Sequence, residues 1–257
     1  PDIHVHAFTP LEISQGAATL GLPIPEFLAM LKDAGLGTLP GTAAEILDDE
    51  VRAIICPDKL NTAEWFEVMR AAHKIGLRST ATIMFGHVES YRHWARHLLR
   101  LREAQSETGG FSELVPLPFV ADEAPIYLKG LARKGPTFRE AILMHSVARL
   151  ALFPWFANVQ ASWVKLGPDG VAAALRAGAN DIGGTLMNES ITRAAGAAHG
   201  EEMPPHAMEE IGYRLDRPVR QRATLYGFPP EAQAQRARQA APLEPVVNRP
   251  AKEYERA

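Results

Sequence analysis

The sequence predicts an α/β fold, because short strand patterns and amphipathic helix patterns alternate along most of the chain. The 257 residues are enough for one substantial core. Hydrophobic residues make up 46% of the chain and charged residues 22%, which is usual for a globular protein. Strands that alternate with helices are expected to be parallel and joined by right-handed crossovers.

Six segments have the length and apolar character of a strand. In chain order they are Ile3–Phe8, Thr38–Pro40, Thr80–Phe85, Phe111–Phe119, Val159–Leu166 and Asp181–Leu186. Val219–Tyr226 offers one further strand candidate. The intervals between these strand candidates are therefore the places where helices are expected.

Helix signals fill the intervals between the strand candidates. Thr42-Ala-Ala-Glu45 has the capping-box pattern that opens a helix, and Asn61 and Glu64 repeat it. Helices are predicted around 27–34, from 61 to 76, around 94–101, and over 137–153, 168–177 and 189–198. We expect one folded unit over residues 1–227. The tail over residues 228–257 lacks periodicity and is expected to be disordered.

Composition narrows the functional classes. The formal net charge of −3 gives no reason to expect nucleic acid or an anionic membrane as a partner. No apolar run approaches the roughly 20 residues that a transmembrane helix needs, and no secretion signal opens the chain. Cys56 is the only cysteine, so we expect no disulfide within the chain, no metal cluster held by several thiolates, and a cytoplasmic protein.

Polar residues gather at the ends of the predicted strands, where a parallel barrel places its functional groups. They are His4 and His6, Thr42 and Glu45, Gly86, His87 and Glu89, Gln160, Ser162 and Lys165, and Asn180, Asp181, Thr185 and Glu189. So many polar groups at one rim favour an enzyme over an inert scaffold.

His4 and His6 allow two interpretations. Side chains two residues apart lie on the same face of a strand, so this pair suits metal ligation, as in zinc amidohydrolases. Asp181 would then complete the site with a ligand such as His87, because His73 and His145 fall inside helix patterns. Alternatively, the two histidines are hydrogen-bonded pocket residues. The role of Glu45 also has two interpretations, since its carboxylate caps a helix or faces a ligand.

Six blocks in a fixed order carry a resemblance to a known family. They are IHVHAFTPLEI, LPGTAAEILDDEVR, STATIMFGHVESYRHW, ELVPLPF, NVQASWVKLG and GANDIGGTLMNESITRAAGA. Together they closely resemble the C-terminal half of the FO synthase family, from about Asp2 to Tyr226. They are more distantly similar to the two radical S-adenosylmethionine (SAM) enzymes of the futalosine route to menaquinone.

The resemblance implies a partial (β/α)8 TIM-type radical SAM barrel that lacks about the first two βα units. In the family, a [4Fe-4S] cluster held by a CxxxCxxC loop splits SAM. The resulting radical cleaves the Cα–Cβ bond of L-tyrosine, and the 4-hydroxybenzyl fragment is joined to 5-amino-6-(D-ribitylamino)uracil. Another radical SAM module, a possible partner, closes the deazaflavin ring.

The resemblance also implies site residues. Thr82, Met84, Gly86, His87 and Glu89 match the GxIxGxxE pattern that supports the adenine of SAM, although Thr82 replaces the first glycine and Met84 the isoleucine. Glu45 resembles the position that meets the ribose or methionyl part of SAM. The residues expected to face the substrates are His4, His6, Gln160, Ser162, Lys165, Asn180, Asp181 and Thr185. Lys165 and Asp181 are alternatively a structural ion pair.

One departure from the family limits what this chain can do alone. The CxxxCxxC loop is absent, and Cys56 cannot replace it, so we expect the cluster ligands upstream and an inactive isolated fragment. Three alternatives remain open at this point. They are an aminofutalosine-type enzyme of menaquinone synthesis, a zinc amidohydrolase-like barrel that uses His4 and His6, and a binding module that acts through a partner.

Overall fold

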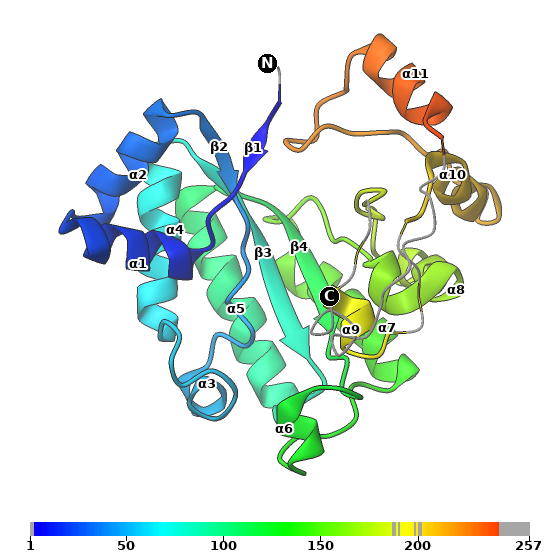
Figure 1. Cartoon of the computed structure of the whole chain (residues 1–257). Helices are drawn as coiled ribbons and strands as arrows, with labels where there is room; N and C mark the ends of the chain where they lie inside the picture. Colours follow the sequence, from blue (N-terminus) through cyan, green and yellow to red (C-terminus); the bar gives the residue numbers. More distant parts are fainter. Residues whose placement is uncertain (1–2, 187–188, 190, 198, 200–201, 242–257) are drawn as a thin grey trace, which may run out of the picture.

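The computed structural model confirms the α/β class and describes residues 3–186, 189, 191–197, 199 and 202–241. A parallel sheet curves through the molecule, and helices α1, α2, α4 and α5 cover one side of it (Figure 1). Helices α7 and α8 continue the helical layer beyond the last strand (Figure 1). This arrangement is that of a barrel that has not closed.

Four strands make the sheet, in the spatial order β1-β2-β3-β4. They are β1 (Val5–His6), β2 (Leu36–Leu39), β3 (Arg78–Phe85) and β4 (Phe111–Pro118). All three pairings are parallel. Two isolated parallel bridges, Leu114 to Val159 and Gln160 to Asp181, continue the order beyond β4. The six predicted strand positions therefore follow one another across the sheet.

The helices connect these strands and pack outside them. They are α1 (Pro10–Leu20), α2 (Ile24–Asp33), α3 (Asp49–Ile55), α4 (Thr62–Lys74), α5 (Tyr91–Thr108), α6 (Pro125–Leu128), α7 (Phe138–Leu152), α8 (Trp163–Arg176), α9 (Ile191–Ala194), α10 (Pro205–Tyr213) and α11 (Glu231–Gln239). Capping boxes begin α1, α4 and α7, which fixes where these helices start. Within the described residues, no helix is long and apolar enough to cross a membrane.

The main core lies between the sheet and the outer helices. Ala81, Ile83 and Phe85 of β3 are fully buried in it, together with Trp65 of α4. A second cluster packs Leu36 and Leu39 of β2 against α1, α2 and α4, and Ala7 joins it. Because side chains alternate along a strand, the residues between these positions face the other side of the sheet.

That other side, which we call the inner face, is rich in polar groups. Its residues include those that alternate with outward core positions, namely His4 and His6, Thr80, Thr82 and Met84, and Glu113, Val115 and Leu117. Thr38 joins them through its contacts with both histidines. Polar side chains on the inner face and apolar side chains on the helix-covered face are the arrangement of a barrel whose interior holds a site.

Two predicted elements differ in the structure at the points where site residues lie. No helix begins at Thr42, because residues 42–47 form turns and α3 starts only after the cap Asp48. The capping role predicted for Glu45 is therefore wrong. The strand predicted over Val159–Leu166 is reduced to the bridges at Val159 and Gln160, since α8 begins at Trp163.

The C-terminal region also differs from the expectation. Val219–Tyr226 forms no strand. The helix predicted over 189–198 is the single turn α9, and the short strand predicted at Asp181–Leu186 is only a bridge. Helix α11 occupies part of the tail that was expected to be disordered, and residues 242–257 lie outside the described residues.

Candidate functional site

The C-terminal end of β3 is held by the buried carboxylate of Glu89. Its Oε1 accepts hydrogen bonds from the Gly86 N–H at 2.5 Å and from the Trp94 indole N–H at 2.8 Å. Its Oε2 accepts from the His87 N–H at 2.8 Å. Burial opposes ionisation, but these three N–H donors keep the pKa of Glu89 below its ordinary value. All of these partners belong to the chain itself, so Glu89 shapes the strand end.

His87 is part of the same turn. Its Nδ1 accepts from the Val88 N–H at 2.8 Å, and its Nε2 lies 3.0 Å from the Met84 carbonyl oxygen, to which it donates. Burial lowers the pKa of His87, so the ring is neutral with its proton on Nε2. Nδ1 also lies 3.1 Å from Glu89 Oε2, but with a neutral ring this contact is not an ion pair.

Gly86 allows the segment after β4 to cross the strand end. Its φ is +99°, and a Cβ placed there would lie 2.2 Å from Pro136 Cδ and 2.3 Å from Pro136 N. Phe119 N–H donates to the Phe85 carbonyl oxygen, and Arg133 N–H donates to that of His87. The end of β3 is therefore closed from outside by residues 119–136.

The chain beyond β2 runs beside β3 and brings Glu45 to it. The Met84 N–H donates to the Glu45 carbonyl oxygen at 2.9 Å, and the buried Thr82 hydroxyl donates to that of Gly41 at 2.6 Å. The Glu45 carboxylate pairs with Lys59 Nζ at 2.8 Å. All six residues predicted to support SAM therefore lie together, along the second half of β3, in the turn after it and in the turn that follows β2.

His4 and His6 both bind one hydroxyl group. His4 Nε2 and His6 Nδ1 each lie 2.7 Å from Thr38 Oγ1, and Thr38 is buried. Burial, and after it the neighbouring His4, lower the pKa of His6. In the described part of the chain, neither histidine belongs to a group of three or more potential metal ligands. The zinc amidohydrolase interpretation therefore lacks its ligand set, since His87 is engaged elsewhere and Asp181 pairs with an arginine.

A buried charged network joins β4 to the segment that follows α10. Glu113 Oε2 accepts from the Tyr226 hydroxyl at 2.7 Å, from Gln160 Nε2 at 2.9 Å and from Arg222 Nη2 at 3.4 Å. Arg222 also pairs with Asp181, and its guanidinium lies 4.3 Å from the centre of the Tyr226 ring. The alternative ion pair between Lys165 and Asp181 is therefore wrong, because Arg222 takes the carboxylate.

The network lies toward the strand starts. Glu113 is the third residue of β4, and the segment with α10 and α11 lies at the end of the sheet opposite α6 (Figure 1). Burial raises the pKa of Glu113, although Arg222 and Tyr226 oppose the shift. Burial and the two carboxylates raise the pKa of Tyr226, so this phenol stays protonated and donates.

The other predicted substrate residues are spread over two places. Asn180 is exposed, and its Oδ1 accepts from the Val159 N–H at 2.9 Å and from Arg149 Nη2 at 2.7 Å, so it ties strand starts together. Ser162 precedes α8, and Lys165 lies in its first turn, half-buried, where burial lowers its pKa. Thr185 is half-buried beyond the Asp181 bridge.

One group of potential metal ligands lies outside the sheet. Asp48, Glu50 and His93 have ligand atoms within 4.8 Å of one another. However, Asp48 already pairs with Arg96 at 3.1 Å and Arg100 at 3.3 Å. Two guanidinium groups on the one buried carboxylate leave little negative charge for a cation.

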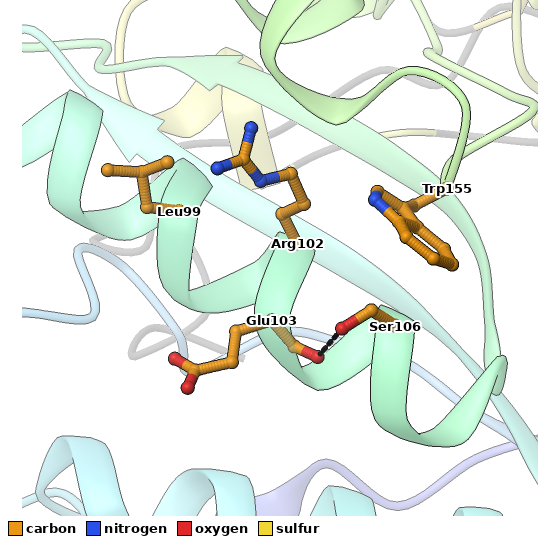
Figure 2. A pocket seen from close by; sticks show the side chains of 5 residues that line it. All are labelled: Leu99, Arg102, Glu103, Ser106 and Trp155. Atoms are coloured by element: carbon orange, nitrogen blue, oxygen red, sulfur yellow. Dashed lines mark hydrogen bonds between the residues drawn. The ribbon is translucent and has the colours of Figure 1, made fainter.

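A shallow hollow of about 410 Å³ lies on the outer surface of α5. Leu99, Arg102, Glu103 and Ser106 line it with Trp155 (Figure 2). It contains none of the predicted site residues, and α5 separates it from the sheet. The inner face of the sheet is therefore the better candidate for the functional site.

Sequence reasoning missed Thr38, Glu113, Arg222 and Tyr226. Glu113 gave a detectable signal, since FSELVPLPF places one carboxylate in an otherwise apolar strand pattern. Arg222 and Tyr226 gave none, because they lie 109 and 113 residues from Glu113 in the sequence.

Comparisons with known proteins agree with the resemblance. Residues 108–232 match the family described as the CofH/MqnC C-terminal region. The chain is 50% identical over 238 residues to the FO synthase of Streptomyces coelicolor, covering 93% of this chain and 28% of that protein. It is 49% identical over 225 residues to the 5-amino-6-(D-ribitylamino)uracil–L-tyrosine 4-hydroxyphenyl transferase of Methanocaldococcus jannaschii, covering 88% of this chain and 63% of that protein.

A solved structure supports the fold. The crystal structure of methylornithine synthase matches with a TM-score of 0.54 at 17% sequence identity, over 89% of this chain and 65% of that protein. At this identity the match concerns the fold alone, and it confirms the partial-barrel prediction. The similarity to FO synthase predicted from the six sequence blocks is also confirmed, and the chain spans only part of the length of these curated relatives.

Proposed function

We propose that this chain is part of a radical SAM transferase that joins the 4-hydroxybenzyl part of L-tyrosine to 5-amino-6-(D-ribitylamino)uracil. The observation that carries the proposal is sequence identity of about 50% over nearly the whole chain to an FO synthase and to the tyrosine 4-hydroxyphenyl transferase itself. These relatives favour this activity over an aminofutalosine-type reaction. The composition favours a cytoplasmic enzyme, and a second radical SAM module is a candidate partner.

The proposed cofactors are SAM and a [4Fe-4S] cluster, which together supply a 5′-deoxyadenosyl radical when bound. The donor set of this chain does not fit the cluster. Three thiolates are needed, whereas the chain has only Cys56, which is buried at the end of α3. The cluster ligands must therefore come from outside this sequence.

The second half of β3 and the turn after β2 fit SAM better than the thiol content of the chain fits the cluster. Thr82 and Met84 lie on the inner face, and the turn beyond β2 brings the Glu45 backbone beside Met84. We assign contact with SAM to Glu45, Thr82 and Met84. We assign positioning to Gly86, His87 and Glu89, because they form the turn that ends β3 and fix the backbone there.

The substrates are proposed to lie on the same inner face. His4 and His6 are exposed at β1, His4 directly before it and His6 at its end, and Ser162, Lys165 and Thr185 follow the last two strand positions. Gln160 and Asp181 support this side through the Glu113 and Arg222 network, and Asn180 supports it through the Val159 backbone. The protein's contribution to such a reaction is to orient the two substrates and exclude water from the radical.

The test uses the protein that carries this chain, with an intact cluster loop. Supplied with SAM, reductant, L-tyrosine and the ribitylaminouracil, it should form the 4-hydroxybenzyl adduct, detected by mass spectrometry. Cleavage of SAM without an adduct would overturn the proposed reaction. Reconstitution of a four-iron cluster on the isolated 257-residue chain would overturn the assignment of the cluster ligands to another part of the protein.

A further inference from the structure

The contact of two histidines with one threonine is a second feature of the inner face. The Thr38 hydroxyl lies 2.7 Å from His4 Nε2 and 2.7 Å from His6 Nδ1, so it binds the two rings through different nitrogens. Gly37 makes room for this arrangement, because a Cβ there would lie 2.5 Å from His4 Cε1. The backbone of β2 therefore approaches the first ring closely while its next residue supplies the bridge.

A hydroxyl group has one proton and two acceptor lone pairs. The Thr38 hydroxyl is buried and contacts only the two rings among the described residues, so its proton is paired only when it donates to one of them. If Thr38 donates to His4 Nε2, His6 must donate through Nδ1, and both rings carry their proton on Nδ1. If Thr38 donates to His6 Nδ1, His4 donates through Nε2, and both rings carry their proton on Nε2. In both states that pair the hydroxyl proton, the two neutral rings adopt the same tautomer, and rotation of the hydroxyl is coupled to a change in both.

The remaining nitrogens face outward from this bridge. Among the described residues, His4 Nδ1 and His6 Nε2 have no hydrogen-bond partner, and both histidines are exposed. In either shared tautomer, one of these two nitrogens is a donor and the other is an acceptor. The pair thus presents complementary hydrogen-bonding groups that exchange roles together.

We propose that His4, Thr38 and His6 form a tautomer-coupled recognition site for a neutral group that both donates and accepts hydrogen bonds. A phenol hydroxyl and the adjacent N–H and C=O of a uracil ring share this chemistry. The choice of these two ligands rests on the proposed function, but the coupling of the rings does not. Thr38 is a positioning residue, because it touches the histidines and acts on the ligand through them.

The coupling is measured by NMR on the 257-residue chain labelled with ¹⁵N-histidine, at mildly alkaline pH. His4→Gln and His6→Gln variants assign the signals. We expect both rings to report the same tautomer in the wild-type chain and in Thr38→Ser, which keeps the hydroxyl. In Thr38→Val, which has nearly the same volume, the two tautomers should become independent.

His73 provides a control for folding in these variants. Its Nδ1 and Nε2 bind two separate hydroxyls, those of Thr108 and Ser79, so its signals should not respond to changes at Thr38. Opposite tautomers at His4 and His6 in the wild-type chain would overturn the coupling. Unchanged tautomers in Thr38→Val with intact His73 signals would also overturn it.

Recognition is tested by titration with p-cresol and with 5-aminouracil, with toluene as the apolar control. We expect at least one of the two polar probes, but not toluene, to shift the His4 and His6 signals. Its dissociation constant should rise about fivefold in Thr38→Val and recover in Thr38→Ser, as for the loss of one neutral hydrogen bond. A response to p-cresol identifies a phenol site, and a response to 5-aminouracil identifies a uracil site.

If neither probe binds, the recognition site is overturned even if the adduct forms in the complete enzyme. If a probe binds and Thr38→Val leaves its affinity unchanged, the role of Thr38 is overturned. Failure of the complete enzyme to form the adduct would instead overturn the proposed function, while leaving the tautomer measurements as they stand.

Discussion

One carboxylate at the end of β3 satisfies three N–H donors that the surrounding core shields from water. Glu89 accepts from the backbone of Gly86 and His87 and from the Trp94 indole, and its side chain is fully buried. A buried donor without a partner costs about 1–3 kcal/mol, so the three donors together make Glu89 a stability determinant of the strand end. The motif that resembles an adenine-binding pattern therefore has a structural task in this chain.

We expect Glu89→Ala to lower the free energy of unfolding by about 4 kcal/mol, since it leaves these donors unpaired in a cavity. Urea unfolding followed by circular dichroism measures this change. The matched control is Glu107→Ala, which removes an exposed pair with Arg70 and should change stability by about 0.5 kcal/mol or less. Equal effects of the two variants would contradict the structural role of Glu89.

At this scale the sequence identified positions better than contacts. His4, His6, Glu45 and Glu89 could be singled out because each lies at a strand end with a polar side chain. Their partners could not, since Thr38 is an ordinary strand residue and Lys59 lies 14 residues beyond Glu45 in the sequence. The capping pattern at Thr42 misled for a related reason. The nearby Asp48 caps the helix instead, accepting from the Glu50 N–H.

At the scale of elements, the segment after α10 connects the strand starts through ion pairs. Arg222 contacts Glu113 of β4 and Asp181 of the next bridge, so one cation connects positions that are not neighbours in the sequence. The pKa of Glu113 is raised by burial, which means that the folded protein disfavours its ionised form more than water does. Arg222 limits that penalty.

Removal of this cation should be pH-dependent. Arg222→Met leaves two buried carboxylates without their guanidinium, and we expect a loss of about 3 kcal/mol at about pH 7. Because the pKa of Glu113 is raised in the folded state, folding favours the protonated carboxyl, so the contribution of Glu113 to stability is present at acidic pH and is lost as the pH rises. A protonated Glu113 also needs the guanidinium less. The deficit should therefore shrink toward about pH 5.

Thermal unfolding of both proteins at a series of pH values measures this deficit. Arg214→Met, which removes an exposed pair with Asp169, is the control and should show no such pH dependence. A deficit that grows on acidification would contradict the account of Glu113.

The crossing of β3 by residues 119–136 depends on one glycine. Gly86→Ala would place a Cβ 2.2 Å from Pro136 at a φ of +99°, and the atoms in its way include backbone. We expect a loss of about 3 kcal/mol or more in stability. Gly109→Ala is the matched control, since its φ is +61° with nothing within 4 Å, and it should cost about 1 kcal/mol. Similar losses of stability in the two variants, measured by chemical unfolding, would show that residues 119–136 move to accommodate the added Cβ.

The order of elements was predictable, but the lengths of the later strands were not. The alternation in NVQASWV fits a strand, yet α8 begins at Trp163, where the indole N–H donates to the Gly184 carbonyl oxygen at 2.8 Å. A short apolar run has no period that separates a strand from the first turn of a helix. Tertiary contacts of this kind decided the boundary.

At the scale of the whole molecule, the sheet is open along β1. Among the described strands, β1 pairs only with β2, and its other edge has no strand beside it. Ile3, Val5 and Phe8 are 79%, 42% and 42% exposed along this segment. An unpaired edge with apolar side chains is a template for pairing with another strand. In the enzyme proposed above, two further strands would close the barrel on this side.

We therefore expect the isolated 257-residue chain to self-associate as its concentration rises, measured by analytical ultracentrifugation. Val5→Lys should weaken this association, because a charged side chain on an edge strand disfavours pairing. Ile54→Lys is the control, since Ile54 is 56% exposed on α3, away from the edge, and should leave the association unchanged. In the enzyme proposed above, where two further strands would cover this position, the same Val5→Lys change should lower stability. A chain that stays monomeric at every concentration would show that this edge does not recruit a strand.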